Sequence, residues 1–207
     1  MRGFVARVRR HAVFELALVV AVALGLAMSV QAYAVKPYRI PSASMEPTLH
    51  VGDRVLVNRL SHRLGAEPKV GQIVVFHPPR GADVSPPRCG TAGEGEGTPM
   101  PCSRPTSEVS SQTFIKRVVG ISGDRIGLRG GRVVRNGRLQ REPYTNPCDG
   151  GPECDLPEVT VPEGFVYLLG DNRGASLDSR FWGPVPISSI IGEATVIYWP
   201  PGRVGDP

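Results

Sequence analysis

The chain has 207 residues, a length that suits one domain with an appendage. Hydrophobic residues make up 41% and charged residues 21% of it, which excludes a mostly disordered chain. The net charge is +5, and residues 1–15 hold four arginines against one glutamate. Because the basic charge is concentrated in this tail, the composition argues against a nucleic-acid-binding domain and for a tail that lies beside a membrane.

A run of 20 uncharged, mostly apolar residues extends from Leu16 to Val35. A helix of this length rises about 30 Å, roughly the thickness of the hydrocarbon core of a bilayer. We therefore expect a transmembrane anchor at 12–35 after a cytoplasmic tail at 1–11, because basic residues remain on the cytoplasmic side.

A cleaved secretory signal is the alternative to an anchor. Residues Ala32, Tyr33 and Ala34 form an Ala-X-Ala pattern of the kind at which such signals are cut. Length favours the anchor, because the apolar region of a cleaved signal usually has only ~7–15 residues. Both interpretations place residues 36–207 outside the cytoplasm.

Short segments rich in β-branched and aromatic residues recur after the anchor, each bounded by turn-forming residues. They lie at 54–58, 72–76, 114–119, 125–128, 132–135, 165–169 and 191–199. The Asn136-Gly137 pair predicts a hairpin within 134–139, and residues 59–66 suit one or two helical turns. The expected fold class is mainly β: an extracytoplasmic all-β domain at 36–207 behind one N-terminal transmembrane helix.

Residues 77–112 interrupt the strand pattern. This segment is rich in Pro, Gly and Ser and has too few bulky apolar side chains to order itself by burial, so we expect a flexible surface insertion. The four cysteines fall in two local pairs, Cys89 with Cys102 and Cys148 with Cys154. Outside the cytoplasm this pattern predicts two local disulfides among three possible connectivities. A zinc site is the alternative, but the chain lacks paired C-x₂-C ligands and a nearby histidine pair.

Two serines, Ser42 and Ser44, lie on a loop between Pro41 and Pro47. A serine hydroxyl is a poor nucleophile at neutral pH and needs a neighbouring proton acceptor. Histidine is the usual partner. None of the four histidines lies in a motif typical of catalysis; they are His11, His50, His62 and His77.

Lysine is the other candidate base. Because the ordinary pKa of lysine is about 10.4, a lysine base must be buried among apolar groups that disfavour its charged form. Lys36 lies at the membrane edge and Lys69 in a polar turn. Lys116 lies within a predicted strand, where it shares a face with Phe114 and Val118. A lysine that reaches out to solvent from an edge strand is the alternative explanation.

Four segments are similar, in order and spacing, to the sequence boxes of bacterial type I signal peptidase, the membrane-bound Ser/Lys protease that removes signal peptides. They are PSASMEPTL at 41–49, GDRVLVN at 52–58, FIKRVVGISGD at 114–124 and GDNRGASLDSRFWGPVP at 170–186. The resemblance extends from about residue 12 to residue 200 and leaves the insertion unmatched. The chain departs from the family at Gly174, Ala175 and Ser122, where Asp, Asn and Pro are usual, which puts the rigidity of these loops in question.

The resemblance implies a role for each serine of the loop. Ser44 would be the nucleophile, and Lys116 would be the general base that takes its proton and later activates water. The Ser42 hydroxyl and the Ser44 backbone amide would form the oxyanion hole. The flanking prolines would hold the two serines rigid, so that less orientation must be established during the reaction.

The resemblance also implies supporting roles. Ser176 would orient the lysine amine, and Asp178 and Arg180 would form an ion pair that supports the site. Asp171 and Asn172 are interpreted as turn formers in the sequence GDNR. Six residues match positions that line shallow apolar pockets for small substrate side chains: Ile40, Met45, Leu49, Val55, Phe114 and Ile115.

The implied activity is cleavage of exported preproteins after Ala-X-Ala at the outer face of the cytoplasmic membrane. A Ser/Lys mechanism requires no metal and no cofactor, and we expect a monomer whose partners are preproteins and the lipid bilayer. One alternative is a Ser/Lys protease dedicated to a single client. Another is a catalytically silent, membrane-tethered module that binds exported chains.

Overall fold

The computed structural model describes residues 14–28, 34–148 and 150–207. Residues 14–28 form a helix with an exposed apolar surface. Among the described residues, no helix combines the length and the apolar character needed to cross a membrane. The predicted anchor at 12–35 runs past both ends of this helix, and the predicted tail at 1–11 lies outside the described residues.

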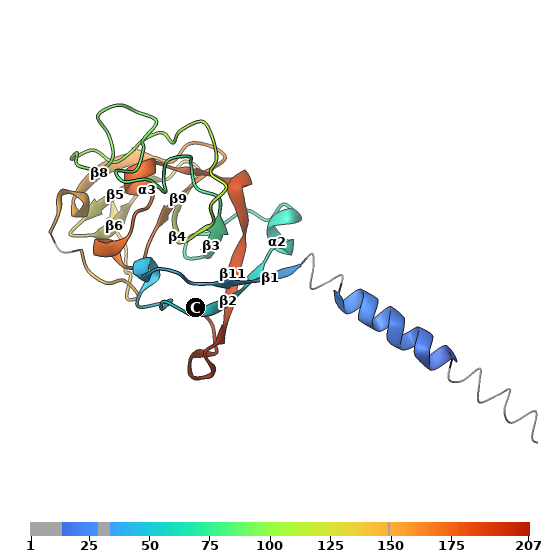
Figure 1. The fold of residues 1–207 in the computed structure, drawn as a ribbon. Helices are drawn as coiled ribbons and strands as arrows, with labels where there is room; N and C mark the ends of the chain where they lie inside the picture. Colours follow the sequence, from blue (N-terminus) through green and yellow to red (C-terminus); the bar gives the residue numbers. More distant parts are fainter. Residues whose placement is uncertain (1–13, 29–33, 149) are drawn as a thin grey trace, which may run out of the picture.

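Two antiparallel sheets make up the body of the protein (Figure 1). The larger sheet has the strand order β1-β2-β11-β3-β4-β9-β10, and the smaller has the order β7-β6-β5-β8. The strands of the larger sheet are β1 (Val35–Arg39), β2 (Arg54–Asn58), β3 (Ile73–Phe76), β4 (Phe114–Ile121), β9 (Phe165–Leu169), β10 (Val185–Pro186) and β11 (Ile190–Trp199). Those of the smaller are β5 (Arg125–Arg129), β6 (Arg132–Arg135), β7 (Arg138–Leu139) and β8 (Leu156–Thr160). The mainly β fold class is thus confirmed.

Short helices connect these strands. The α-helical turns are α2 (Leu60–Arg63) and α3 (Ser179–Trp182). The 3₁₀ turns are η1 (Ala43–Met45), η2 (Pro152–Cys154), η3 (Arg173–Ala175), η4 (Ile187–Ser189) and η5 (Pro201–Arg203). The predicted helical turn within 59–66 is α2.

All seven predicted strands are present, with ends shifted by at most two residues. The predicted hairpin joins β6 to β7, and both Asn136 and Gly137 have the positive φ that its tight turn requires. No predicted strand segment corresponds to β1, β8 or β10, and β7 was indicated only by the hairpin. All four of these strands lie at sheet edges, and all but β7 contain proline; such strands carry a weak alternating pattern.

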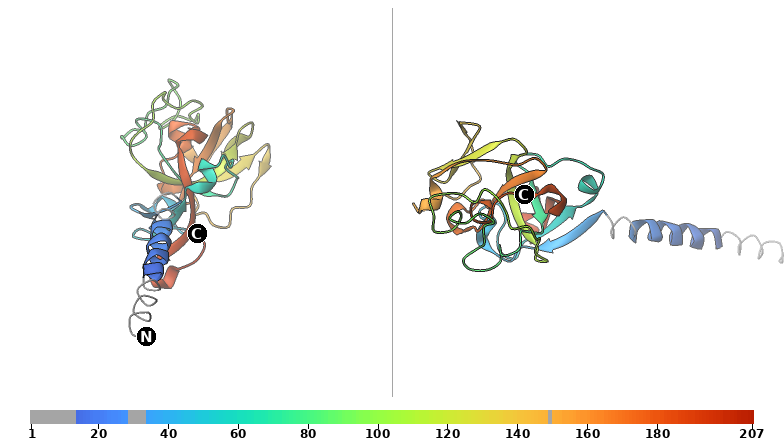
Figure 2. Two further views of the ribbon diagram at one scale, coloured as in Figure 1. Left: turned by 90° about the vertical axis from the view of Figure 1, so that its right-hand side faces the viewer. Right: turned by 90° about the horizontal axis from the view of Figure 1, so that it is seen from above.

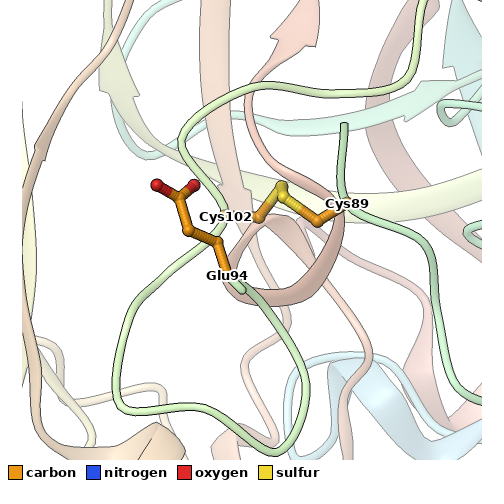
Figure 3. A group of neighbouring side chains, drawn as sticks. All are labelled: Cys89, Glu94 and Cys102. Carbon is orange, nitrogen blue, oxygen red and sulfur yellow. A yellow bond between two sulfur atoms is a disulfide. The ribbon is translucent and has the colours of Figure 1, made fainter. Parts of the chain in front are cut away.

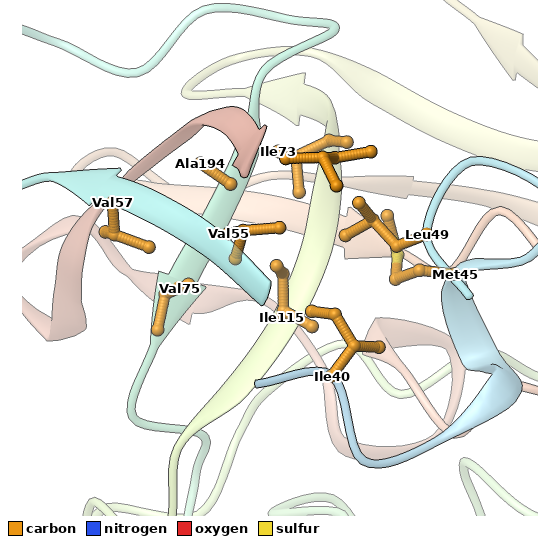
Figure 4. Packing of buried hydrophobic residues seen from close by; sticks show 10 residues of the cluster. Ile40, Met45, Leu49, Val55, Val57, Ile73, Val75, Ile115 and Ala194 are labelled. Atoms are coloured by element: carbon orange, nitrogen blue, oxygen red, sulfur yellow. The ribbon is translucent and has the colours of Figure 1, made fainter. Parts of the chain in front are cut away.

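Strand β4 contributes to the hydrophobic clusters on both faces of the large sheet. Ile115 packs into a cluster with β2, β3 and β11, while Val118 packs into a second cluster around α3. The first cluster also contains Met45, Leu49 and Val55, which point into it from η1, the following turn and β2 (Figure 4). Each of these three side chains is fully buried, so packing against the hydrophobic core holds the loop that carries the serines in place.

The insertion at 77–112 differs from the flexible loop that we expected. Ala82 and Cys102 are buried, and the Cys102 amide donates to the Arg180 carbonyl at 2.9 Å. The segment is held by backbone hydrogen bonds and a disulfide rather than by bulky apolar side chains, which is why its composition suggested disorder.

The cysteines are paired as the sequence favoured, Cys89 with Cys102 and Cys148 with Cys154. Glu94 lies beside the first disulfide (Figure 3). Its carboxylate and the two cysteine sulfurs lie within 4.8 Å of one another, close enough to be considered as metal ligands. Both sulfurs are bonded to each other, however, and the Glu94 carboxylate accepts the Ser103 amide at 2.7 Å. This group therefore closes the insertion loop and does not supply thiolate ligands for a metal.

Candidate active site

Ser44 lies in η1, within the loop that joins β1 to β2. The two ends of this loop are tied together, because the Ile40 amide donates to the Asp53 carbonyl and the Gly52 amide donates to the Ile40 carbonyl. The Leu49 amide donates to the Met45 carbonyl one turn later. Buried apolar side chains and this backbone bonding together fix the position of the Ser44 hydroxyl.

Lys116 and Ser44, which lie 72 positions apart in sequence, meet at the surface of the larger sheet. Lys116 Nζ lies 2.7 Å from Ser44 Oγ, within hydrogen-bonding distance. The two residues are only 5% and 7% exposed. The sequence had left open a lysine that reaches solvent, and the burial of Lys116 excludes that arrangement.

Burial is the main cause of an altered Lys116 pKa. Loss of solvation lowers the pKa of the Lys116 amine from its ordinary value of 10.5 to about 8. The negative charge of Asp178 raises this pKa, and the positive charge of Arg180 lowers it. Because these two charges are paired, their effects on the amine oppose each other, and loss of solvation dominates. A substantial fraction of the amine is therefore neutral near pH 8 and able to accept a proton.

Ser42 places a second hydroxyl beside the first. Its Oγ lies 3.4 Å from Ser44 Oγ, the residue is exposed, and its side chain makes no capping bond to η1. The described histidines are engaged elsewhere or exposed. His77 Nδ1 bonds the Gln112 carbonyl, and no histidine in the described part of the chain bonds Ser44.

The segment 170–173 holds the serine loop from the other side. The Asn172 amide donates to the Ser44 carbonyl and its side-chain amide donates to the Ala43 carbonyl, both at 3.1 Å. Gly170 lies against the same loop, since a Cβ added to it would overlap the Ser44 carbonyl and the Ser176 side chain. The sequence suggested a simple turn here, whereas Asn172 holds the loop of the candidate nucleophile through two hydrogen bonds.

Asp178 and Arg180 form a buried ion pair, in which Nε and one terminal nitrogen of Arg180 donate to the two carboxylate oxygens at 2.8 and 3.0 Å. Asp178 also accepts the Gly170 amide at 3.1 Å, which links the pair to the segment behind Ser44. Burial alone would raise the pKa of Asp178, but the charge and hydrogen bonds of Arg180 hold it below its ordinary value. The carboxylate is therefore ionised at neutral pH.

Ser176 is buried next to this ion pair. Its hydroxyl donates to the Leu177 carbonyl at 3.4 Å, and among the described residues it makes no hydrogen bond to Lys116. The Ser176 carbonyl accepts from Arg180 at 2.9 Å, so its backbone is fixed by the ion pair. The predicted contact with the Lys116 amine is therefore not formed in this structure.

The interpretation of Asp171 as a turn former missed its main contacts. Asp171 is fully buried and receives two hydrogen bonds from Arg117, at 2.9 and 2.7 Å. Thr48 donates to the same carboxylate at 2.5 Å. Arg117 also donates to the Gly71 carbonyl at 2.7 Å. This cluster joins the loop of Ser44 to the strand of Lys116. The available signal was Arg117 itself, a second charged residue within the otherwise apolar strand segment 114–119.

Replacement of Asp171 by Asn is expected to destabilise the protein by about 3–5 kcal/mol, because it leaves the Arg117 guanidinium buried without a counter-charge. Urea denaturation of the full chain measures this loss. Glu108→Gln is the matched control, since its ion pair with Arg80 is exposed and contributes less than about 1 kcal/mol. Equal stability of the two variants would contradict the structural role of Asp171.

Ser44 and Lys116 open into a cleft of about 530 Å³, which we call the catalytic cleft. Its apolar wall includes Phe114 and Ile115, and the insertion contributes Ala82 to it. A hollow of about 30 Å³ continues along β1 and is lined by Ile40 together with Phe114 and Ile115. Of the six predicted pocket residues, these three therefore lie on the cleft or the hollow. The other three, Met45, Leu49 and Val55, lie beneath it in the hydrophobic core.

Comparison with known proteins relates this arrangement to a family. The family described as signal peptidase, peptidase S26, matches residues 13–199. A probable signal peptidase I-1 from Synechocystis sp. is 38% identical over 185 residues, which cover 89% of this chain and 81% of that protein. A signal peptidase I from Leptolyngbya laminosa is 36% identical over 181 residues, covering 87% of this chain and 77% of that protein.

A crystal structure of a signal peptidase I from Enterococcus faecalis V583 is 24% identical, covers 62% of this chain and 97% of that chain, and has a TM-score of 0.39. The assignment rests on the sequence matches rather than on this structure. The family match spans most of the chain, and the relatives above exceed 30% identity over most of their own length. The chain belongs to the signal peptidase family, peptidase S26.

Proposed function

We propose that this chain is a membrane-bound serine endopeptidase that removes signal peptides from exported preproteins. The observation that carries the proposal is the approach of Lys116 Nζ to within 2.7 Å of Ser44 Oγ, at a buried position that opens into a cleft. The relatives named signal peptidase I supply the substrate class.

The reaction proceeds in two steps. The neutral Lys116 amine takes the proton of the Ser44 hydroxyl while Oγ attacks the carbonyl carbon of the scissile bond. The lysine then gives this proton to the leaving amine, and the mature protein departs while the signal peptide remains as an ester on Ser44. Lys116 next takes a proton from water, whose oxygen attacks the ester, and Ser44 regains its proton as the signal peptide is released.

The oxyanion of each tetrahedral intermediate accepts hydrogen bonds from the Ser42 hydroxyl and the Ser44 amide. Support for this assignment comes from the exposed Ser42 hydroxyl, which lies 3.4 Å from Ser44 Oγ, and from the position of Ser44 in the first turn of η1, whose amides lack acceptors within that turn. Asp178 and Arg180 form the buried ion pair beside the site, and the Ser176 backbone is bound to it.

Small side chains of the substrate fit the apolar part of the catalytic cleft. Phe114 and Ile115 line it, and Ile40 lines the adjoining hollow, so an extended Ala-X-Ala segment can place its two alanines there. Met45, Leu49 and Val55 contribute by supporting this floor rather than by touching substrate. The Ser/Lys chemistry itself uses no metal or cofactor.

The proposed location is the cytoplasmic membrane, with a cytoplasmic tail at 1–11, an anchor at 12–35 and the catalytic domain at 36–207 on the outer side. The uncharged run in the sequence and the exposed apolar side chains of residues 14–28 support an anchor. The two disulfides support an oxidising exterior.

The proposal is tested with the detergent-solubilised full chain and a preprotein that carries Ala-X-Ala at its cleavage site. Intact mass of the products is expected to place the cut after the second alanine. Cleavage of one client only, among several unrelated signal peptides, would favour the dedicated protease instead. Binding of all of them without cleavage would favour the silent binding module.

Gly170→Ala is expected to lower kcat by about 10²-fold, because its Cβ overlaps the Ser44 carbonyl and displaces the nucleophile from Lys116. Overpacking also costs about 1–3 kcal/mol of stability, which thermal unfolding measures separately. Gly202→Ala is the matched control, since a Cβ there meets nothing within 4 Å. A Gly170→Ala enzyme with the wild-type kcat would show that this contact does not set the geometry of the dyad.

A further inference from the structure

A second cleft of about 500 Å³ lies beside the catalytic cleft. One of its walls is formed by residues 95–98 and Met100 of the insertion, and another by Pro152 and Glu153. The first wall lies inside the loop closed by the Cys89–Cys102 disulfide, and the second inside the loop closed by Cys148–Cys154. Both disulfides, which the Ser/Lys chemistry does not require, therefore build this one cleft.

The second cleft adjoins the catalytic cleft. Ala175 and Leu177 line both, and both residues are exposed, with Leu177 42% exposed, so they form a low ridge between the two spaces. Because Ala175 and Leu177 are exposed and shared, a chain in the catalytic cleft that continues past them enters the second cleft.

The two ends of this path lie beside different elements of the fold. The hollow beside the catalytic cleft is lined by Tyr38 and Ile40 at β1. The second cleft instead lies by α3 and the start of β8, at Phe181 and Leu156. Figure 1 and the right-hand view of Figure 2 show the smaller sheet at the end of the body away from the start of β1.

The second cleft carries a net negative charge. Arg173 and Arg180 line it, but each is buried and paired, Arg173 with Glu142 and Arg180 with Asp178. The remaining charged lining residues are Glu96, which is exposed, and Glu153, which is partly exposed. An extended chain lying here meets carboxylates and apolar surface, with no unpaired cation among the lining residues.

We propose that the second cleft receives the segment of the preprotein that follows the cut, and that it favours basic over acidic side chains there. This inference rests on the proposed function. Because β1 follows the proposed anchor, the apolar signal peptide approaches along the hollow at β1. The mature segment then continues across Ala175 and Leu177, which line both clefts. The disulfide-closed insertion is thus a determinant of substrate preference.

Two preproteins test the proposal. They share one signal peptide and one Ala-X-Ala site and differ only in carrying Lys or Glu at about the third to sixth positions after the cut, the reach of an extended chain into the second cleft. The wild-type full chain is expected to cleave the Lys substrate with a kcat/KM about two- to fivefold above that of the Glu substrate, the range of exposed charge pairs. The Glu96→Lys/Glu153→Lys variant is expected to reverse this preference.

The control is Glu67→Lys/Glu163→Lys, which makes the same change of charge at exposed positions outside both clefts and is expected to keep the wild-type preference. Glu96→Lys alone, at an exposed side chain, gives a partial reversal if the double variant does not fold. Equal cleavage of both substrates by the wild type, or the same shift in the control variant, would overturn the inference. Failure to cleave either substrate would instead overturn the proposed function.

Discussion

Ser44→Ala is expected to reduce kcat by at least about 10⁴-fold, because the variant lacks the atom that forms the ester with the signal peptide. The fold should be unaffected, since the hydroxyl contacts only Lys116 and Ser42, and the position of the loop depends on the buried side chains of Met45 and Leu49. Cleavage of the Ala-X-Ala preprotein, followed by intact mass, measures the loss.

Two other serine variants act as controls for this result. Ser42→Ala removes one proposed oxyanion donor and is expected to cost about 10²–10³-fold in kcat, clearly less than loss of the nucleophile. Ser107→Ala, at an exposed position of the insertion, is expected to match the wild type. If Ser44→Ala cleaved the preprotein as fast as Ser107→Ala, then Ser44 would not be the nucleophile.

Lys116→Met is expected to lower kcat by at least about 10³-fold, because Met fills the same space but cannot accept the proton of Ser44. Lys69→Met, at an exposed position, is the matched control and is expected to retain wild-type activity. Lys116→Arg is also expected to be inactive, since a guanidinium stays protonated at every accessible pH. Activity in Lys116→Met would require a different base, for which His50, six residues from Ser44 in sequence, would be the first candidate.

Loss of activity in Lys116→Met is expected without loss of stability. The folded-state pKa of about 8 lies below the ordinary value of 10.5, so below pH 8 the wild type carries the cost of burying a charged amine. This difference corresponds to about 3 kcal/mol. The variant should therefore be more stable than the wild type at pH 7, and the gain should shrink as pH rises from 8 to 10.5. A variant that is less stable at pH 7 would contradict the origin assigned to the shift.

The alternating pattern of β4 is where sequence reasoning was most successful. It placed Lys116 on one face with Phe114 and Val118, and the structure buries the lysine there. The strand-like segments and the Asn-Gly hairpin were also predicted, because their signals are local to a few residues. The search for a base suggested Lys116 as a partner for a serine, but only the family resemblance assigned it to Ser44, since no local pattern specifies a contact across 72 positions.

Contacts between distant segments explain most of what was missed. Asp171 lies in a stretch that is typical of a turn, and its pairing with Arg117 and Thr48 depends on how β4 and the serine loop pack together. Met45, Leu49 and Val55 matched pocket positions by motif, yet their side chains point into the core. A hydrophobic period or a motif identifies apolar residues. It does not show which of their side chains stay accessible to substrate after the chain has packed.

The insertion was misjudged for a related reason. Composition measures how much apolar surface a segment can bury, whereas this segment is held largely by backbone hydrogen bonds and the Cys89–Cys102 bond. Residues Ala82 and Asp83 line the catalytic cleft, and Gly95 to Thr98 together with Met100 line the second cleft. The part of the chain that the family resemblance left unmatched thus borders both spaces that a substrate is proposed to occupy.

The central claim is that the neutral Lys116 amine is the base for Ser44, and the pH dependence of single-turnover cleavage tests it most directly. Because the amine accepts a proton only when neutral, and burial lowers its pKa to about 8, the rate is expected to rise through pH 8 and level off above it. A rate that levels off near pH 6.5, as expected for a histidine base, or one that does not change between pH 6 and 10, would contradict the claim.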